Sequence, residues 1–349
     1  YCSRKKSALK IVSMLKEALL YRKLENNKTG CFLCSHRCLI TDGHFGICQA
    51  RQNKGGILYT LAYGELCAAN IDPIEKKPIF HMLPGSRSYS FAALGCNFRC
   101  GFCQNWQISQ KKEADKLGIK TQPKTPEKIV SEAIGYKCQS ISYTYSEPTI
   151  FFEYALETAK LAKEKGLYNI FVTNGYMTPE ALEMIKPYLD AANVDLKSFD
   201  DANYQKVCGG RLQPVLDTIS LMRRMNIWVE VTTLVVPGFN DSALELKNIA
   251  EFLSGAGKEI PWHISRFHPD YKITDKDPTP LTILKEAYTI GKDAGLRYVY
   301  IGNTLEEEKT YCYNCGQDLI ARAGFSVVKN VLKNGKCPGC NTTLDGIAL

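Results

Sequence analysis

The sequence has 349 residues, of which 45% are hydrophobic and 23% charged, and its formal net charge is +8 at pH 7. This length predicts two or three domains, and the composition excludes a disordered or collagen-like chain. No apolar run reaches the roughly 18 residues that a membrane-spanning helix requires, so we expect no membrane contact. The positive charges are spread along the sequence, which makes nucleic-acid binding unfavoured.

The first 25 residues predict an amphipathic helix. Their apolar side chains share one helical stripe, and lysines interrupt the apolar core that a signal peptide would need. The stripe consists of Ala8, Ile11, Val12, Leu15, Ala18 and Leu19. Because residue 1 is not methionine, the sequence leaves open whether a leader was removed. Further along, Ile57–Tyr63 and Leu66–Ile71 predict two strands.

Between about residues 89 and 303, short β-branched or aromatic runs alternate with helical patterns, which predicts βα units and a parallel sheet. The expected strands are Tyr89–Leu94, Ser140–Tyr145, Asn169–Thr173, Ala192–Leu196, Ile227–Val235, Trp262–Ser265 and Tyr298–Ile301. The expected helices are Pro126–Lys137, Thr149–Lys165, Pro179–Tyr188, Leu212–Met225, Ser242–Ser254 and Pro280–Ala294. About six such units are too few for a closed barrel of eight.

We therefore expect an α/β fold with a partial (β/α)6 TIM-like barrel, whose site lies at the carboxyl ends of the strands. The expected division of the chain has three parts. Residues 1–85 hold the N-terminal helix and a cysteine-rich segment, residues 86–303 the partial barrel, and residues 304–349 a small four-cysteine unit that resembles a zinc ribbon.

The fifteen cysteines are clustered. The clusters are Cys31, Cys34, Cys38 and Cys48, then Cys96, Cys100 and Cys103, and finally Cys312, Cys315, Cys337 and Cys340. Disulfide frameworks belong to small secreted domains, whereas this chain is long enough to be stabilised by burial, so the clusters indicate metal binding. Thiolate clusters survive best in a reducing compartment, and we expect a cytoplasmic protein.

The middle cluster forms a C-x3-C-x2-C loop directly after the first barrel strand. A [4Fe–4S] cluster has four irons that each take an outside ligand, so Cys96, Cys100 and Cys103 leave one iron open to a small molecule. Electron transfer alone would favour a fourth cysteine. A zinc-binding loop would also need a fourth ligand, and no histidine is nearby. The spacing therefore predicts a catalytic iron–sulfur cluster.

This loop, with Phe102 before its last cysteine, resembles the radical S-adenosylmethionine (radical SAM) superfamily, and the resemblance covers about Tyr89 to Asn303. It implies that the open iron chelates S-adenosylmethionine and that the reduced cluster donates an electron to break the sulfonium carbon–sulfur bond. The product would be a 5′-deoxyadenosyl radical, which abstracts hydrogen from a small-molecule or protein substrate. An electron donor such as flavodoxin or ferredoxin is expected.

Three further motifs more narrowly resemble the AmmeMemoRadiSam system radical SAM enzymes, which are themselves similar to pyruvate formate-lyase activating enzymes. The motifs are Asp72–Pro78 (DPIEKKP), Cys100–Trp106 (CGFCQNW) with Ile108 and Ser109, and Thr144–Thr149 (TYSEPT). The family label implies AMMECR and Memo proteins as partners, and it supplies no reaction.

The superfamily resemblance implies cofactor-binding residues where strands end, namely Ser146, Glu147, Thr173, Asn174, Asp195, Lys197 and His268. Ser146-Glu147-Pro148 stands where the superfamily usually has a Gly-Gly-Glu turn for the methionine amino group. The carboxylate is kept, and the two glycines are absent. Val236–Asp241 resembles the loop that supports the adenine. From the residues alone, Asp195 and Lys197 fit a structural ion pair equally well, and His268 fits an ordinary loop histidine.

The two outer cysteine groups differ in spacing. Cys312-x2-Cys315 and Cys337-x2-Cys340 are paired knuckles typical of a zinc ribbon, which favours structural zinc over iron. The group from Cys31 to Cys48 fits zinc or an auxiliary iron–sulfur cluster, with His36 and His44 as spare ligands. The isolated cysteines Cys67, Cys138 and Cys208 are expected to be buried or free thiols.

Three functional hypotheses follow. The first is an enzyme that uses a 5′-deoxyadenosyl radical on a small molecule or partner protein. The second is an activase that generates a glycyl radical on another protein. The third is a non-catalytic metal-binding module that docks a protein or nucleic acid, which leaves the three-cysteine loop without a role.

Overall fold

The computed structural model describes residues 15–349, and residues 1–14 lie outside the described part. Eight strands form its central sheet: β8 (Ala68–Pro73), β9 (Arg87–Ala92), β11 (Ser140–Tyr143), β12 (Tyr168–Thr173), β13 (Ala191–Asp195), β14 (Trp228–Val235), β15 (Trp262–Arg266) and β16 (Val299–Gly302). Their order is β16-β15-β14-β13-β12-β11-β9-β8. The strands from β9 to β16 run parallel, and β8 pairs antiparallel with β9. The seven parallel strands confirm the predicted ones.

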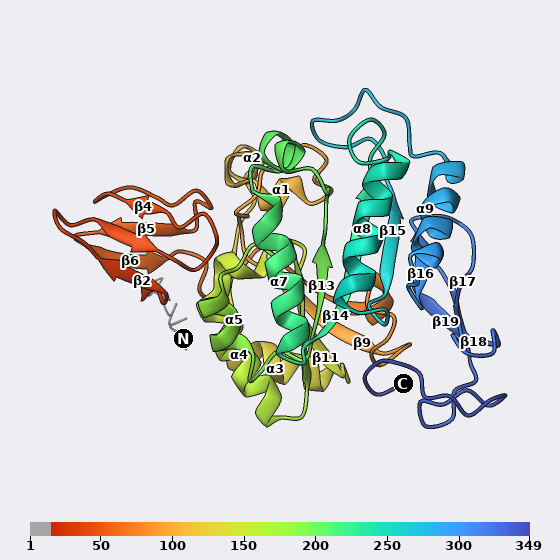
Figure 1. Ribbon diagram of the computed structural model, residues 1–349. Coiled ribbons are helices and arrows are strands. Elements are labelled where there is room, and N and C mark those ends of the chain that lie inside the picture. The colour runs from red at the N-terminus through yellow and green to blue at the C-terminus, as the bar shows by residue number, and fades with distance from the viewer. Residues whose placement is uncertain (1–14) are drawn as a thin grey trace, which may run out of the picture.

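Six long helices alternate with these strands, as the sequence predicts. They are α3 (Pro126–Gly135), α4 (Phe152–Glu164), α5 (Pro179–Ile185), α7 (Leu212–Arg224), α8 (Ala243–Ala256) and α9 (Leu281–Asp293). The Thr-Pro starts act as expected, because Thr125 accepts from the Lys128 amide and Thr178 from the Ala181 amide, with proline in the first turn. In Figure 1 the helices lie in front of the strands.

Short elements fill the connections. They are β7 (Glu65–Leu66), η1 (Ile74–Lys76), α1 (Trp106–Ser109), α2 (Lys111–Lys116), β10 (Gln122–Pro123), η2 (Pro148–Phe151), α6 (Asp201–Asn203) and the π-helical turn η3 (Tyr204–Cys208). Several of them follow the carboxyl ends of strands, where a βα fold gathers its functional loops. Among the helices of residues 15–349, none has the length and hydropathy to cross a membrane.

The two faces of the sheet have different side chains. On one face, Phe91, Tyr143 and Phe171 pack edge to face along neighbouring strands, with ring centroids 5.0 and 5.1 Å apart. On the other, Ser88 and Ser142 form a hydrogen bond of 2.6 Å between hydroxyls. Because side chains alternate along a strand, this pattern fixes the register and directs the aromatic face towards the helices.

The N-terminal part forms two small antiparallel sheets instead of the predicted helix. One is made of β1 (Lys16–Glu17), β5 (Arg51–Lys54) and β6 (Ile57–Thr60), and the other of β2 (Tyr21–Lys23), β3 (Thr29–Cys31) and β4 (Leu39–Ile40). Leu20 has φ +55°, which interrupts a right-handed helix. The helix prediction is wrong for the described residues of this stretch, because pairing of β1 with β6 overrides the local apolar stripe.

The C-terminal part is an antiparallel sheet of β17 (Glu308–Tyr311), β18 (Asp318–Ala323) and β19 (Ser326–Asn330). It packs through a small apolar cluster against Phe80, Tyr298 and Tyr300, near the start of β16. The buried Arg322 donates to the Phe80 carbonyl at 2.8 Å. Figure 1 shows the N-terminal strands and the C-terminal strands on opposite flanks of the central sheet.

Candidate active site

The predicted catalytic cysteines lie on the loop that follows β9, at the carboxyl end of the parallel strands. Cys100 is buried, whereas Cys96 and Cys103 are half-buried. The Cys96 sulfur accepts a hydrogen bond from the Phe98 amide at 3.3 Å and another from Asn174 Nδ2 at 3.7 Å. Donors directed at a sulfur stabilise its thiolate form, which is the form that ligates metal.

Cys208 lies against this loop, and sequence analysis had expected only a buried or free thiol there. A hydrogen bond from the Cys208 thiol, and next the Lys197 ammonium, hold the pKa of Cys100 below its ordinary value against the effect of burial. Cys208 ends the π-helical turn η3, and such turns occur often at functional sites. The structure thus brings together two cysteines that are distant in the sequence.

The η3 turn also holds the cysteine loop in place. The Arg99 amide donates to the Cys208 carbonyl at 2.7 Å. A Cβ atom on Gly210 would lie 2.3 Å from the Phe98 ring, so only glycine permits this close approach. On the other side, the Lys272 amide donates to the Gly101 carbonyl at 3.0 Å. The loop is therefore clamped between segments that follow β13 and β15.

Glu147 ties the ends of β11 and β12 together. Its buried carboxylate accepts hydrogen bonds from the Thr173 hydroxyl at 2.7 Å, from the Asn174 amide at 2.8 Å, and from both the amide and the hydroxyl of Thr149. Burial raises the pKa of Glu147 above its ordinary value, although these four donors favour the ionised form. In this arrangement Glu147 directly positions Thr173 and Asn174.

Asn174 carries this network to the cysteine loop. Its Nδ2 donates to Asn97 Oδ1 at 2.7 Å, and its Oδ1 accepts from the Tyr176 amide at 3.1 Å. Asn97 is 1% exposed, and its own Nδ2 has no hydrogen-bond partner among the described residues. A buried donor without a partner is costly, so its presence beside the cysteines fits an anionic group at this position. The three thiols and this donor fit an iron–sulfur cluster.

Asp195 and Lys197 form an ion pair of 3.0 Å at the end of β13. Although burial would lower it, the pKa of Lys197 is raised well above its ordinary value by the Asp195 carboxylate and by Cys100. The sequence allowed either a structural ion pair or cofactor-binding residues. The ion pair is present, and it also lies beside Cys100, a predicted cluster ligand. Asn240 supports it by donating to the Lys197 carbonyl at 2.8 Å.

The remaining predicted cofactor residues lie at the same end of the sheet in different settings. The Ser146 hydroxyl is buried and donates to the Ala93 carbonyl at 2.6 Å. In the loop Val236–Asp241, the Asn240 side chain accepts from the Val236 amide at 2.7 Å, which closes the turn. His268 is exposed on the loop after β15.

The C-terminal cysteines form a compact group of four thiols. The sulfurs of Cys312, Cys315, Cys337 and Cys340 all lie within 4.8 Å of one another. The pairs Cys312–Cys340 and Cys315–Cys337 are each separated by 3.6 Å. Among residues 15–349, these four are the one group of three or more His, Cys, Asp or Glu side chains whose ligand atoms come this close together. Four thiols around one point match the coordination number of a single tetrahedral ion.

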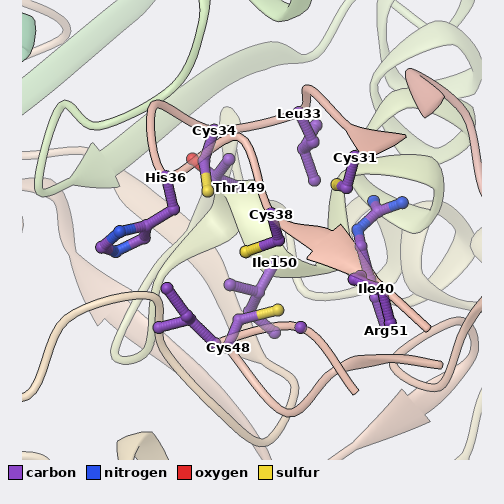
Figure 2. A pocket seen from close by; sticks show the side chains of 12 residues that line it. Cys31, Leu33, Cys34, His36, Cys38, Ile40, Cys48, Arg51, Thr149 and Ile150 are labelled. Carbon is purple, nitrogen blue, oxygen red and sulfur yellow. The ribbon is translucent and has the colours of Figure 1, made fainter. Parts of the chain in front are cut away.

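The N-terminal cysteines line a pocket of their own, together with His36, Arg51, Thr149 and Ile150 (Figure 2). The lining cysteines are Cys31, Cys34, Cys38 and Cys48. They do not form a group as tight as the C-terminal four. Every cysteine from residue 15 onward is free, which agrees with metal-binding groups and not with disulfides.

Sequence reasoning missed Cys208 and Asn97 as members of the site, whereas Asn240 lies in the loop Val236–Asp241 that the resemblance had indicated. Cys208 was judged by its isolation in the sequence, and the π-helical turn that brings it to Cys100 has no recognisable local pattern. Asn97 could have been noticed, because it stands between two predicted cluster ligands and a polar residue there must find a partner when buried.

Comparisons with known proteins agree with this geometry. Residues 92–253 match the model of the Radical SAM superfamily. An uncharacterized protein of Methanocaldococcus jannaschii is 45% identical over 336 residues, which cover 95% of this chain and 99% of the relative. The pyruvate formate-lyase-activating enzyme of Clostridium pasteurianum is 23% identical over 212 residues, covering 55% of this chain and 84% of that enzyme.

Among solved structures, a radical SAM methyltransferase from Sphaerobacter thermophilus has a TM-score of 0.50 at 13% identity. The alignment covers 63% of this chain and 67% of that one, and it shows similarity of fold alone. The matched residues 92–253 contain the three-cysteine loop and the strand ends that surround it. The resemblance to radical SAM enzymes and to pyruvate formate-lyase activating enzymes is thereby confirmed, and the chain belongs to the radical SAM superfamily of enzymes.

Proposed function

We propose that the chain holds a [4Fe–4S] cluster on Cys96, Cys100 and Cys103 and uses it with S-adenosylmethionine to abstract hydrogen from its substrate. The observation that carries this proposal is the three-thiol loop at the carboxyl end of β9, which is clamped on both sides and contains a buried donor, Asn97 Nδ2, without a partner among residues 15–349. When bound, the cluster would supply the electron that cleaves S-adenosylmethionine to methionine and a 5′-deoxyadenosyl radical.

The surrounding residues prepare this site for charge and orientation. Lys197 places a cation beside Cys100, which offsets the negative charge of the thiolates. Phe98 and Asn174 direct N–H groups at the Cys96 sulfur. Glu147 fixes Asn174 through its amide, so its proposed contribution to cofactor binding is to hold the strand ends in register. Ser146, Thr173 and Asp195 complete the proposed cofactor surface, with His268 on the outer loop.

The test is replacement of Cys100 by alanine, with Cys138→Ala as the matched control. Cys138 is also buried, but it lies just before β11, at the opposite end of the sheet from the loop. We expect Cys100→Ala to abolish 5′-deoxyadenosine formation with dithionite and S-adenosylmethionine, and the control to retain it. Normal cofactor cleavage by Cys100→Ala would contradict the proposal.

A second candidate is activation of a glycyl-radical enzyme, which the relation to a pyruvate formate-lyase-activating enzyme favours. In that case the abstracted hydrogen comes from a glycine Cα of another protein. Incubation of the reduced holoenzyme and S-adenosylmethionine with pyruvate formate-lyase should then give a glycyl-radical doublet in the electron paramagnetic resonance (EPR) spectrum. Cofactor cleavage without that doublet favours a different substrate.

The narrower resemblance to the AmmeMemoRadiSam system enzymes extends the proposal to partners. On this basis AMMECR and Memo proteins act with the chain, a flavodoxin or ferredoxin reduces it in the cytoplasm, and the C-terminal four cysteines bind structural zinc. Copurification of the tagged chain with either partner protein tests the association. The proposed architecture is a partial barrel over residues 86–303, between units at 1–85 and 304–349, with β8 of the first unit added to the barrel sheet as an antiparallel edge strand.

A further inference from the structure

The N-terminal pocket has the features of a second metal-cluster site. Figure 2 shows the side chains of Cys31, Cys34, Cys38 and Cys48 around a common space, with Arg51 beside Cys31. The wall is completed by Thr149 and Ile150, which belong to η2 of the central fold. Four thiols of the N-terminal unit therefore line one pocket, and the central fold supplies part of its wall.

The spacing of these thiols distinguishes the kind of metal. The C-terminal sulfurs lie within 4.8 Å of one another, as a single tetrahedral ion requires, whereas among residues 15–349 the N-terminal cysteines do not gather into such a group. A four-iron cube carries its thiolates on separate irons, so it holds them farther apart than one ion does. Four thiols that line a pocket without meeting at one point thus fit a cube, whereas the compact C-terminal group fits a single ion.

Arg51 adds an independent observation. Its side chain is 1% exposed, and its Nη2 atom binds both carboxylate oxygens of Glu153 at 2.8 Å. Its Nε–H, however, has no hydrogen-bond partner among residues 15–349, although the side chain lines the pocket. A buried, charged donor without a partner points to an anionic acceptor. The thiolates and inorganic sulfides of a cluster provide such acceptors.

The pocket touches the catalytic loop directly. His36 donates from Nε2 to the Asn97 carbonyl at 2.8 Å. A Cβ atom on Gly95 would lie 3.1 Å from the Cys48 carbonyl, and Gly95 has φ +114°, a conformation open mainly to glycine. One layer of chain therefore separates the N-terminal cysteines from Cys96.

We propose that Cys31, Cys34, Cys38 and Cys48 bind a second [4Fe–4S] cluster, fully ligated by thiolates and adjacent to the catalytic one. This inference rests on the proposed function and extends it. The two proposals can be tested separately, because the second cluster is detected by its iron content and EPR signal in a chain that lacks the catalytic cysteines. Its loss would leave the assignment of Cys96, Cys100 and Cys103 intact.

The main experiment uses the full-length triple variant C96A/C100A/C103A, reconstituted anaerobically with iron and sulfide. We expect it to retain about four irons per chain, half of the wild-type content. After dithionite reduction its EPR signal should stay unchanged when S-adenosylmethionine is added, because four thiolates leave no open iron. The wild-type spectrum should change on the same addition.

The reciprocal variant is C34A/C38A, with Cys138→Ala as the matched control. We expect C34A/C38A to lose about four irons and to keep the cofactor-sensitive signal, while the control keeps both clusters. Zinc content reports on folding of the C-terminal unit, which should hold about one zinc in every variant. Retention of the cofactor-sensitive signal by C34A/C38A reports on folding of the central sheet, and the two readouts together exclude general misfolding as the cause of iron loss.

Two results would overturn the proposal. One is a triple variant that contains no iron and about two zincs, which would make the N-terminal site a zinc site. The other is a triple variant whose EPR signal shifts with S-adenosylmethionine, which would show an open iron. A third measurement tests adjacency: the doubly reduced wild type should show signals broadened by spin coupling, and neither variant should. Additive wild-type signals would contradict the contact between the two sites.

Discussion

The two four-cysteine groups at the ends of the chain serve opposite ends of the same sheet. The N-terminal group contacts the segments after β9 and β12. The backbone of Cys34 forms an isolated β-bridge with Met177, and the Cys48 carbonyl lies close to Gly95. The C-terminal group packs near the start of β16, with Tyr298 and Tyr300. In βα folds the carboxyl ends of strands hold the chemistry and the amino ends contribute stability. We therefore expect the two cysteine groups to have different tasks, according to the sheet edge that each contacts.

The largest expected effect comes from breaking the compact C-terminal site. Cys337 is buried within it, and Cys337→Ala should release the metal and unfold the unit, because structural zinc contributes roughly 10 kcal/mol or more to the folding of such small modules. Zinc content and limited proteolysis of the β17–β19 sheet measure this. Formation of 5′-deoxyadenosine should persist, and its parallel loss would abolish the distinction between the two groups.

The next effect concerns the N-terminal side. Glu153→Gln should lower the free energy of unfolding by about 3–5 kcal/mol, because it leaves the buried Arg51 guanidinium without its counter-ion. Urea unfolding measures the change. The matched control is Glu251→Gln on α8, whose exposed pair with Lys247 contributes under about 1 kcal/mol. Equal effects of the two substitutions would show that the buried pair is not special.

Acidification should lower the free energy of unfolding through His81, whose ring bonds to the Asp345 carbonyl of the C-terminal unit. Burial lowers the pKa of His81 to about 4, against the Glu230 carboxylate, which raises it. Because the unfolded chain takes up this proton near pH 6.5 and the folded chain only near 4, the stability contribution is complete above 6.5 and declines as the pH falls towards 4. The loss amounts to up to about 3 kcal/mol. Unfolding free energies between pH 7 and 4 should flatten in His81→Gln, and an unchanged slope would refute the assignment.

The smallest effect should come from the contact between the N-terminal pocket and the cysteine loop at residues 95–103. His36→Ala removes the hydrogen bond to the Asn97 carbonyl, which contributes about 1 kcal/mol. We expect hydrogen exchange of the loop at residues 95–103 to become a few times faster, with both cluster contents unchanged. His44→Ala is the control, since His44 is exposed and bonds only within its own turn. Faster exchange in both variants would indicate general loosening.

Local signals explain why the central sheet could be predicted. Its strands are short β-branched runs, and its helices start at Thr-Pro caps that act within a few residues. The prediction of an N-terminal helix failed because Lys16 and Glu17 pair with Thr60 and Tyr59 in a sheet. An apolar stripe in the sequence does not reveal this contact.

The site followed the same rule. The spacing of Cys96, Cys100 and Cys103 is local and identified the loop, and the carboxylate of Glu147 was found by resemblance. Its four donors come from the start of η2 and the end of β12, and Cys208 arrives on the turn after β13. Sequence thus identified the loops and the proposed ligands, while the contacts that orient them depend on tertiary packing.

The wall of the N-terminal pocket has a consequence for the order of assembly. Thr149 and Ile150 close the pocket, and Glu153 holds its Arg51, so the site exists only after β11 and α4 have folded against the N-terminal strands. The C-terminal group carries all four ligands between residues 312 and 340 and can take its ion as soon as that segment is made. Metal loading at the N-terminal site should therefore depend on prior folding of the central sheet, whereas loading at the C-terminal site should not.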